Sequence, residues 1–234
     1  MQKIAIIPAR GGSKRIPGKN VKPFHGRPII SYAITAAVQS KLFDRIIVST
    51  DCEKIAEVAT EYGAEVPFLR SHETANDTAS MAQAIIETLT KLAGENQCYE
   101  QVCCLFATAP FVDAQLILKA QSQLSERDSD SVIVVQQNSN PIMRSLQVDE
   151  TGHLGMVWKN HLRTRSQDLA HTYHDAAQMY WAKTSALIEQ GTFYTNKASA
   201  LCIGELEAHD IDTPEDWTIA ERLWAFNQRT DTAA

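Results

Sequence analysis

Short apolar runs alternate with amphipathic segments along the first two thirds of the chain. Continuous runs rich in β-branched or aromatic residues predict buried strands at residues 4–8, 45–50, 101–107 and 131–135. The segments between them carry apolar residues at helical spacing and predict helices at residues 28–40, 52–62, about 78–92 and 113–125. Strands that alternate with helices predict an α/β fold with a doubly wound, mostly parallel sheet of the Rossmann-like type.

Local signals set the expected ends of several elements. Gly63 follows the second helical segment and predicts its C-terminal end. Pro67 lies within the apolar segment 65–69, so we expect that segment to form only a short or edge strand. Asp77 or Thr78 is the expected N-cap of the helix that ends near Leu92.

Residues 136–167 break the regular alternation of strands and helices. Asn, Ser, Pro and Gly interrupt two short apolar stretches at residues 146–148 and 154–158. This pattern predicts short antiparallel ribbons, either as a protruding arm or as a solvent-exposed hairpin. We expect one domain over residues 1–234, with a small β-rich arm within about 136–170.

The composition is that of a globular protein with an acidic balance of charge. Of 234 residues, 44% are hydrophobic and 21% are charged, and the formal net charge of -6 argues against general nucleic-acid binding. Five cysteines without a C-x-x-C spacing indicate neither a disulfide framework nor a structural zinc site. The sequence has no signal-peptide pattern and no apolar run near the roughly 20 residues that cross a bilayer, so we expect a cytoplasmic protein.

A basic, glycine-bearing loop follows the first predicted strand. It carries the cations Arg10, Lys14, Arg15 and Lys19 around a Gly11-Gly12 pair. Glycine lets a backbone approach a ligand closely, and consecutive N–H groups in such a loop can bind an anion. The spacing matches neither the Walker loop nor the dinucleotide fingerprint. A phosphate-binding loop of another kind is the functional interpretation, and a solvated basic turn is the alternative.

The run PARGGSKRIPGKN resembles the N-terminal signature of the acylneuraminate cytidylyltransferases, which activate sialic-acid-type sugars as CMP conjugates. The resemblance implies that the loop binds the triphosphate of CTP. It also implies that an Arg followed by a D-T-A-S motif surrounds the base and ribose, although an ordinary capped loop explains residues 70–80 as well. The implied nucleotide-binding residues are Ala9, Arg10, Gly11, Gly12, Ser13, Lys14, Lys19, Asn20, Arg70, Asp77, Ala79 and Ser80.

A second concentration of polar residues lies at positions 163–175. Two arginines there can pair with a carboxylate or phosphate through planar hydrogen bonds, and the neighbouring polar side chains can contact hydroxyl or amide groups. RTRSQDL followed by YHDAAQMYW resembles the pseudaminic acid branch of the family more than the sialic acid branch, which usually has glycine near Ala177. Phe106 replaces a glutamine that the family often carries, which implies a related sugar. The implied sugar-binding residues are Phe106, Arg163, Arg165, Gln167, Tyr173, His174, Asp175 and Tyr180, with Phe193 and Tyr194 as weaker candidates.

An Asp-x-Asp pair near the C-terminus is the third candidate feature. Asp210 and Asp212 lie two residues apart at the end of an expected strand, which would project both carboxylates to one side. Mg²⁺ is commonly held by one or two carboxylates together with substrate phosphates. Thr213 and Asp216 have the spacing of a helix capping box, which leaves the Asp pair unexplained. The family carries the same D-I-D-T motif around its catalytic metal.

Together the resemblance implies a Mg²⁺-dependent cytidylyltransferase. CTP and a nine-carbon nonulosonic acid, with pseudaminic acid first and sialic, legionaminic or 3-deoxy-octulosonic acid as alternatives, would give CMP-sugar and pyrophosphate. The implied catalytic residues are Arg10 and Lys19, which steady the pyrophosphate, and Asp212, a hypothetical base. The resemblance also implies a homodimer. A glycosyltransferase with a D-x-D metal site and a non-catalytic nucleotide-binding protein are the alternatives outside the family.

Overall fold

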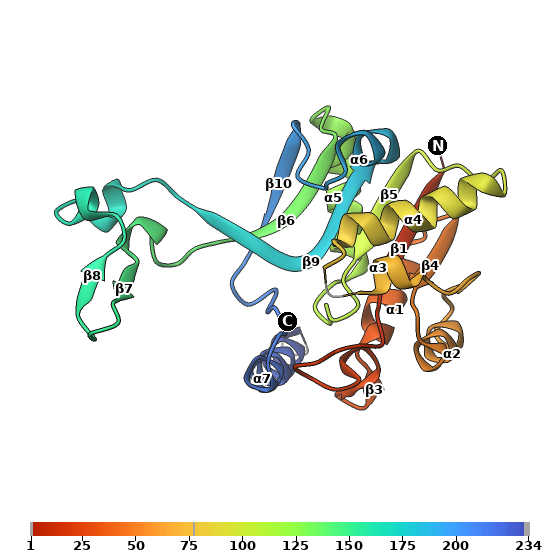
Figure 1. The fold of residues 1–234 in the computed structure, drawn as a ribbon, viewed down its shortest axis with the longest axis horizontal. Coiled ribbons are helices and arrows are strands. Elements are labelled where there is room, and N and C mark those ends of the chain that lie inside the picture. Colours follow the sequence, from red (N-terminus) through yellow and green to blue (C-terminus); the bar gives the residue numbers. More distant parts are fainter. Residues whose placement is uncertain (1, 77, 232–234) are drawn as a thin grey trace.

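A six-stranded sheet forms the centre of the computed structural model, which describes residues 2–76 and 78–231 (Figure 1). The strand order is β10-β6-β9-β5-β1-β4. β9 pairs antiparallel with β5 and β6, and the other strands run in one common direction. The strands are β1 (Lys3–Pro8), β4 (Arg45–Ser49), β5 (Gln101–Leu105), β6 (Ser131–Gln137), β9 (Tyr173–Lys183) and β10 (Ala198–Ile203). The predicted mostly parallel α/β fold is confirmed.

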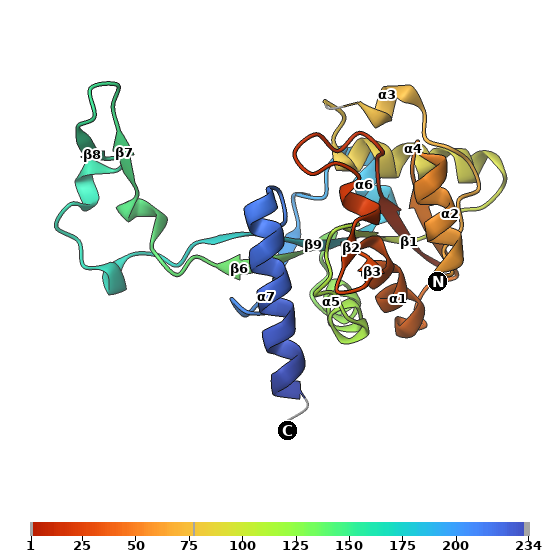
Figure 2. The same cartoon turned by 90° about the horizontal axis from the view of Figure 1, so that it is seen from below.

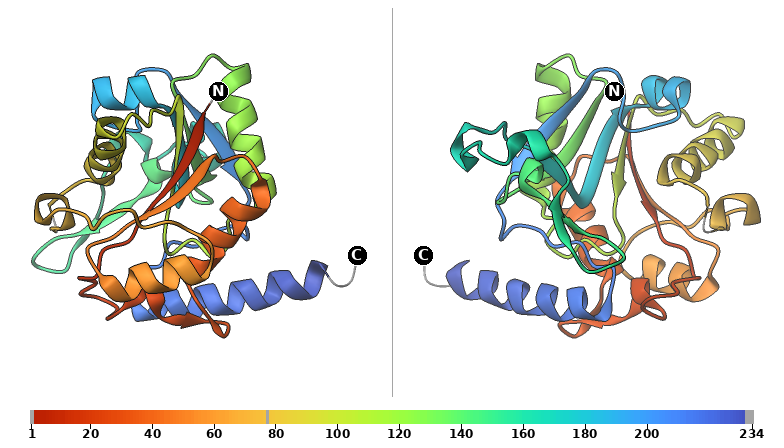
Figure 3. Two further views of the ribbon diagram at one scale, coloured as in Figure 1. Left: turned by 90° about the vertical axis from the view of Figure 1, so that its right-hand side faces the viewer. Right: turned by 60° about the vertical axis from the view of Figure 1, so that its left-hand side comes forward.

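Helices cover both faces of this sheet (Figure 3). α1 (Ile30–Ser40) and α5 (Ala114–Glu126) lie on one face, and α4 (Met81–Gly94) and α6 (Thr184–Gln190) lie on the other. α7 (Pro214–Asp231) lies across one end of the molecule. The smaller elements are β2 (Pro23–Phe24), β3 (Arg27–Pro28), α2 (Glu53–Glu61), α3 (His72–Ala75), and the 3-10 turns Lys19–Val21, Ile142–Arg144, Lys159–His161 and Ser166–Asp168. Among the described residues, no helix is both long enough and apolar enough to span a membrane.

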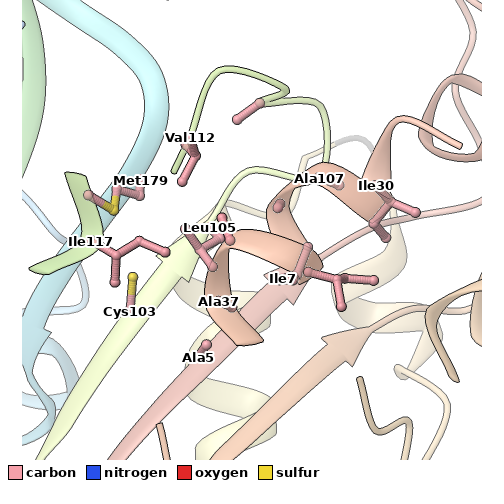
Figure 4. Close-up of a cluster of buried hydrophobic side chains, with 14 of the residues drawn as sticks. Ala5, Ile7, Ile30, Ala37, Cys103, Leu105, Ala107, Val112, Ile117 and Met179 are labelled. Carbon is pink, nitrogen blue, oxygen red and sulfur yellow. The ribbon is translucent and has the colours of Figure 1, made fainter. Parts of the chain in front are cut away.

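The core has two layers because successive strand residues point to opposite faces of the sheet. One layer joins Ala5, Ile7, Cys103 and Leu105 to Ile30, Ala37 and Ile117 of α1 and α5 (Figure 4). The other joins Ile4, Ile6, Val102 and Cys104 to Ile85, Leu89 and Leu187 of α4 and α6. Residues on both sheet faces are buried, which explains the continuous apolar runs in the sequence.

A third, smaller cluster holds α7 against the segment after the basic loop. Phe24 meets Trp217 edge-on, with ring centroids 5.6 Å apart. The His25 ring stacks on Trp224 at 4.6 Å and 28°. Ile211 is fully buried in the same cluster, so packing fixes the chain between β10 and α7 beside the basic loop.

Two sequence-based boundaries are wrong, and the segment expected to form a short or edge strand is shortened further than expected. The expected strand at 65–69 is reduced to one isolated bridge between Ile47 and Glu65, since Pro67 has no N–H to extend a ladder. The N-cap of α4 is Ser80, which forms a capping box with Gln83, so Thr78 is not the cap; Asp77, the other expected cap, lies outside the described residues. β10 ends at Ile203, so the Asp-x-Asp pair lies on a loop and not at the end of a strand.

An arm built from β7 (Leu146–Val148) and β8 (Leu154–Met156) extends away from the sheet (Figures 1 and 2). These strands pair antiparallel. At the base of the arm, the backbone N–H of Asn138 donates to the carbonyl of Thr172 at 2.9 Å. The assignment of residues 1–234 to one domain stays a prediction.

Candidate active site

The basic loop lies at the carboxyl end of β1, where ligands of open α/β sheets bind. Its backbone is fixed from two sides. The N–H of Gly11 donates to Asp51 Oδ1 at 2.8 Å, and the buried Asn20 side chain donates to the carbonyl of Arg10 at 2.9 Å. The Ser13 N–H donates to the carbonyl of Gly11 at 3.0 Å. The backbone N–H groups of Gly11 and Ser13, which were expected to bind an anion, therefore have partners within the protein. Asn20, which was expected to bind the nucleotide, holds the loop backbone.

Close packing explains why glycine occupies position 11. A Cβ added to Gly11 would lie 2.9 Å from Cys52 Cβ, closer than carbon atoms tolerate without displacement. A Cβ added to Gly12 would have no heavy atom within 4 Å. Gly11 thus lets the loop rest directly on the turn between β4 and α2.

Gly11→Ala will lower the melting temperature and, if the loop binds CTP as the resemblance implies, raise the KM for CTP by about tenfold, because overpacking costs about 1–3 kcal/mol or displaces the loop. Gly12→Ala, which adds the same methyl group in open space, will leave the melting temperature near that of the wild type. Thermal unfolding without ligand and CTP kinetics measure the two effects. Equal melting temperatures and equal KM values for wild type and Gly11→Ala would contradict this prediction.

Lys19 connects the basic loop to the loop between β10 and α7. Its Nζ donates to the carbonyl of Ile211 and lies 3.7 Å from Asp212 Oδ1. Arg15 Nη2 lies 2.9 Å from the same carboxylate oxygen. Burial lowers the pKa of Lys19, and the nearby charges of Asp212 and Asp210 partly oppose that effect. The fold therefore places cations of one loop against carboxylates almost two hundred residues away in sequence.

Asp210 and Asp212 converge through the loop geometry that follows β10. Asp216 Oδ2 accepts the N–H of Asp212 at 3.1 Å and of Thr213 at 2.7 Å. In return, Thr213 Oγ1 accepts the N–H of Asp216 at 3.2 Å, which completes the predicted capping box. Burial raises the pKa of Asp210, and the neighbouring charge of Asp212 raises it further. A cation between the two carboxylates would relieve both effects.

The Asp pair fits a divalent cation that takes its other ligands from water and substrate. Two carboxylates are a hard-oxygen donor set of the kind that Mg²⁺ uses with nucleoside phosphates. No group of three or more His, Cys, Asp or Glu side chains suited to a metal occurs in the described ranges, 2–76 and 78–231. Asp210 and Asp212 are therefore suited to hold a cation jointly with phosphate and not in an all-protein cage.

The loop that follows residue 69 presents a guanidinium toward the same edge. Arg70 is partly buried, and within the described part of the chain its Nε and Nη2 atoms have no hydrogen-bond partner. Burial lowers the pKa of Arg70, while the charges of Asp51 and Glu87 favour the cation. Arg10 Nη1 donates to the carbonyl of Asn76 at 3.3 Å, so the two loops touch. Buried donors without a partner are the feature expected of a group that awaits a ligand.

Other residues predicted around the base have structural partners. Ser80 and Gln83 form the capping box of α4 with hydrogen bonds of 2.7 and 3.2 Å. The backbone N–H groups of Thr78 and Ala79 both donate to Asn76 Oδ1. These hydrogen bonds fix the backbone of residues 78–80 without a ligand.

Glu87, on α4, anchors the loop that carries Arg70. Its carboxylate accepts the N–H of Ser71 at 3.0 Å and the hydroxyl of Thr74, and it lies 2.6 Å from Lys91 Nζ. Burial opposes the charged carboxylate, yet the hydrogen bonds from Lys91, Thr74 and Ser71 outweigh burial and lower the pKa of Glu87 to about 2. The charged form of Glu87 therefore stabilises the folded loop.

This lowered pKa predicts a pH-dependent stability difference. A carboxyl whose pKa falls from 4.5 to about 2 on folding stabilises the protein above pH 4.5 and loses that contribution as pH falls toward 2. Glu87→Gln will reduce the free energy of unfolding by about 2 kcal/mol at pH 7. The difference will shrink steadily between pH 4.5 and 3 in urea titrations, and a difference independent of pH would contradict the assignment.

An aromatic wall lies beside the end of β5. The ring of Tyr180 meets Phe106 edge-on at 5.2 Å and lies 5.1 Å from Phe193. The hydroxyls of Tyr180 and Tyr194 both donate to Asp175 Oδ2. Ala177 has φ 51, a left-handed conformation that favours glycine. Ala177 therefore has the left-handed backbone conformation that glycine usually adopts.

The remaining predicted sugar-binding residues lie apart from this wall. Tyr173 and His174 begin β9, and His174 Nδ1 is 2.9 Å from Asn138 Oδ1. Arg163, Arg165 and Gln167 lie between β8 and β9, in the segment that completes the arm, and the arm extends away from the loop between β10 and α7 (Figure 1). Arg165 Nε pairs locally with Asp168 Oδ2 at 3.0 Å. The structure thus separates the arginines from the carboxylate loop of their own chain.

The sequence analysis did not predict Asp51 and Glu87 as residues that shape the site. Asp51 directly follows the strand predicted at residues 45–50, so its place at the carboxyl end of that strand was a usable signal. Glu87 lies within a regular amphipathic helix and gives no local signal, because only folding brings it to Ser71.

Known proteins match this chain over nearly its whole length. A family model described as cytidylyltransferase matches residues 4–230. A pseudaminic acid cytidylyltransferase of Campylobacter jejuni is 36% identical over 230 residues, 98% of this chain and 99% of the relative. A CMP-N,N'-diacetyllegionaminic acid synthase of Legionella pneumophila is 36% identical over 235 residues, 97% of this chain and 98% of the relative. A solved CMP:2-keto-3-deoxy-manno-octonic acid synthetase complexed with CTP shares the fold, with a TM-score of 0.71, 15% identity and coverage of 97% and 100%.

Proposed function

The chain belongs to the cytidylyltransferase family, and from that membership we propose that it transfers CMP from CTP to a nine-carbon nonulosonic acid, with pseudaminic acid as the preferred sugar. One observation in the structure carries the proposal. Lys19 of the basic loop contacts the loop of Asp210 and Asp212, so cations for a triphosphate and carboxylates for a metal belong to one site. The name of the Campylobacter jejuni relative supports the choice of pseudaminic acid, and the Legionella pneumophila relative of equal identity makes legionaminic acid the first alternative.

In the proposed reaction, the anomeric hydroxyl oxygen of the sugar attacks the α-phosphorus of CTP. A new bond forms between that oxygen and phosphorus, the bond to the bridging α–β oxygen breaks, and pyrophosphate departs with its electron pair. Arg10 and Lys19 stabilise the negative charge of the departing group, as preorganised cations do in phosphoryl and nucleotidyl transfer. Arg70, with donors that lack protein partners, is proposed to bind the nucleotide beside α4.

Asp210 and Asp212 are proposed to hold Mg²⁺ against the phosphates. When bound there, the cation would neutralise phosphate charge and lower the pKa of a hydroxyl near it. Asp212 is also the proposed acceptor of the proton from the sugar hydroxyl. Its contacts with Arg15 and Lys19 hold the carboxylate at the junction of the two loops.

The arm is proposed to pair with a second copy of the chain. Val148 and Leu154, from its two strands, are 64% and 65% exposed, which is unusual for aliphatic side chains of a paired ribbon. Association would cover these residues and carry Arg163 and Arg165 toward the sugar site of the partner. Sedimentation of the wild type and of a Val148→Lys, Leu154→Lys variant will distinguish a dimer from a monomer.

A panel assay tests the proposed activity. The protein is incubated with CTP, Mg²⁺ and pseudaminic, legionaminic, N-acetylneuraminic or 3-deoxy-octulosonic acid, and CMP conjugates and pyrophosphate are measured. We expect the highest kcat/KM with pseudaminic acid. Product only with another sugar would overturn the sugar assignment, and no product with any of them would contradict the activity.

A further inference from the structure

The strand β9 contains an irregularity that brings Asp175 to the aromatic wall. Tyr180 pairs with Ile133 of β6, whereas Asp175 pairs with Val135. Residues five apart on a regular strand point to opposite faces, but Ile133 and Val135 share a face. The bulge, which includes Ala177 in its left-handed conformation, therefore places Asp175 and Tyr180 on the same face of the sheet.

The carboxylate of Asp175 accepts hydrogen bonds from both sides of this wall. Oδ1 accepts the N–H of Ala177 at 2.8 Å. Oδ2 accepts the hydroxyl proton of Tyr194 at 2.7 Å and that of Tyr180. Each tyrosine has one hydroxyl proton, so both protons are committed to the carboxylate and only lone pairs remain on the phenolic oxygens.

The electrostatic state of the two tyrosines agrees with this arrangement. Burial raises the pKa of Tyr194 to about 12, with the hydrogen bond to Asp175 as the next cause. Burial and the same carboxylate also raise the pKa of Tyr180. Both phenols therefore stay protonated at neutral pH, and neither becomes a negative charge in the wall.

The wall lies at the carboxyl end of the parallel strands, with Tyr180 and Phe193 buried and Tyr194 at its solvent-facing side. Phe106 follows β5 directly, and its backbone N–H donates to the carbonyl of Gln178 in the bulge at 3.0 Å. The side of the wall formed by Tyr194 is exposed. Apolar rings next to a pair of hydrogen-bond acceptors suit a substituent that combines a methyl group with an N–H donor.

We propose that Asp175 is a positioning residue that fixes the hydroxyls of Tyr180 and Tyr194 as acceptors, so that this wall selects an acylamido substituent of the sugar. The inference rests on the proposed function. The amide N–H would donate to a phenolic oxygen, and the acyl methyl group would contact the rings. The negative charge of Asp175 would also direct the carboxylate of the sugar away from this wall.

Asp175→Asn tests the proposal, because a carboxamide can donate to a phenolic oxygen and release a tyrosine proton toward the ligand. We expect the KM for an acylamido nonulosonic acid to rise about tenfold, with the KM for CTP changed less than twofold. Selectivity for that sugar over an analogue with hydroxyl in place of acylamido will fall about tenfold. Tyr194→Phe, which keeps the ring, will change both values in the same direction by about threefold.

A measurement without substrate reports the hydrogen bonds themselves. Titration followed by tyrosine ultraviolet absorbance or ¹³Cζ NMR will show the Tyr194 pKa near 12 in the wild type and lower in Asp175→Asn. Asp128→Asn removes a carboxylate from the turn between α5 and β6 and is the matched control, with sugar selectivity and tyrosine titration as in the wild type.

Two results would overturn the proposal. An unchanged selectivity ratio in Asp175→Asn would show that the hydroxyls of Tyr180 and Tyr194 do not discriminate the acylamido substituent from a hydroxyl. Equal rises in the KM for sugar and for CTP, together with a lower melting temperature, would assign Asp175 to folding alone. Failure of the proposed function is separate, because it appears as the absence of any CMP conjugate from the wild type.

Discussion

Asp212→Asn will lower kcat by about three orders of magnitude. Added Mg²⁺ will not raise kcat of this variant back toward the wild-type value. Asp212 is proposed to bind the metal and to accept a proton, and its carboxylate also pairs with Arg15 at 2.9 Å and with Lys19 at 3.7 Å. The amide removes the charge and the basicity while it preserves the shape. Removal of one preorganised electrostatic contact costs about 10²–10³ in kcat, and the additional role in proton transfer increases the loss.

Asp210→Asn separates the two roles of Asp212. Asp210 is assigned only to the cation, so its variant will recover a large part of kcat as Mg²⁺ is raised. Pyrophosphate release over a Mg²⁺ series measures both variants. Glu215→Gln, which removes an exposed carboxylate in the first turn of α7, is the matched control and will keep wild-type kinetics. Full activity of Asp212→Asn would remove this residue from both roles.

Lys19→Met will lower kcat/KM for CTP by about 10²–10³, because the ammonium group that faces the carboxylate loop is also proposed to stabilise departing pyrophosphate. The melting temperature will stay constant or rise. Lys19 is 18% exposed, and burial lowers its pKa, so the charged side chain is held at a cost that an apolar side chain avoids. A loss of activity without a loss of stability is the signature of a group kept for function.

Two further variants control for the change of side chain at position 19. Lys22→Met removes a cation whose Nζ lies 4.2 Å from the centre of the Trp217 ring, and it will lower stability slightly with little change in kcat/KM. Lys19→Arg retains the charge and will recover part of the activity. A Lys19→Met variant with wild-type kcat/KM and a lower melting temperature would assign Lys19 to the packing of α7 instead.

Much of the sheet and its helices could be predicted because burial leaves a direct pattern in the chain. Apart from Gln101, the runs at 4–8 and 101–107 are apolar, since helices cover both faces of the sheet at these strands. The strand β9 was not predicted. Its residues 173–175 are polar and its bulge interrupts the regular alternation, so its pairing between β5 and β6 depends on partners far away in sequence.

The sequence by itself determined the basic loop, the capping box at Thr213, the α/β class and the family, because each rests on residues that are close together along the chain. Tertiary structure alone decided that Lys19 meets Asp212, that Asp51 engages Gly11, and that a bulge carries Asp175 to two tyrosine hydroxyls. These contacts join segments that are far apart in sequence and that strand pairing and the packing of α7 bring together. Local sequence records the residue types that a site needs, whereas the folded backbone sets the distances between them.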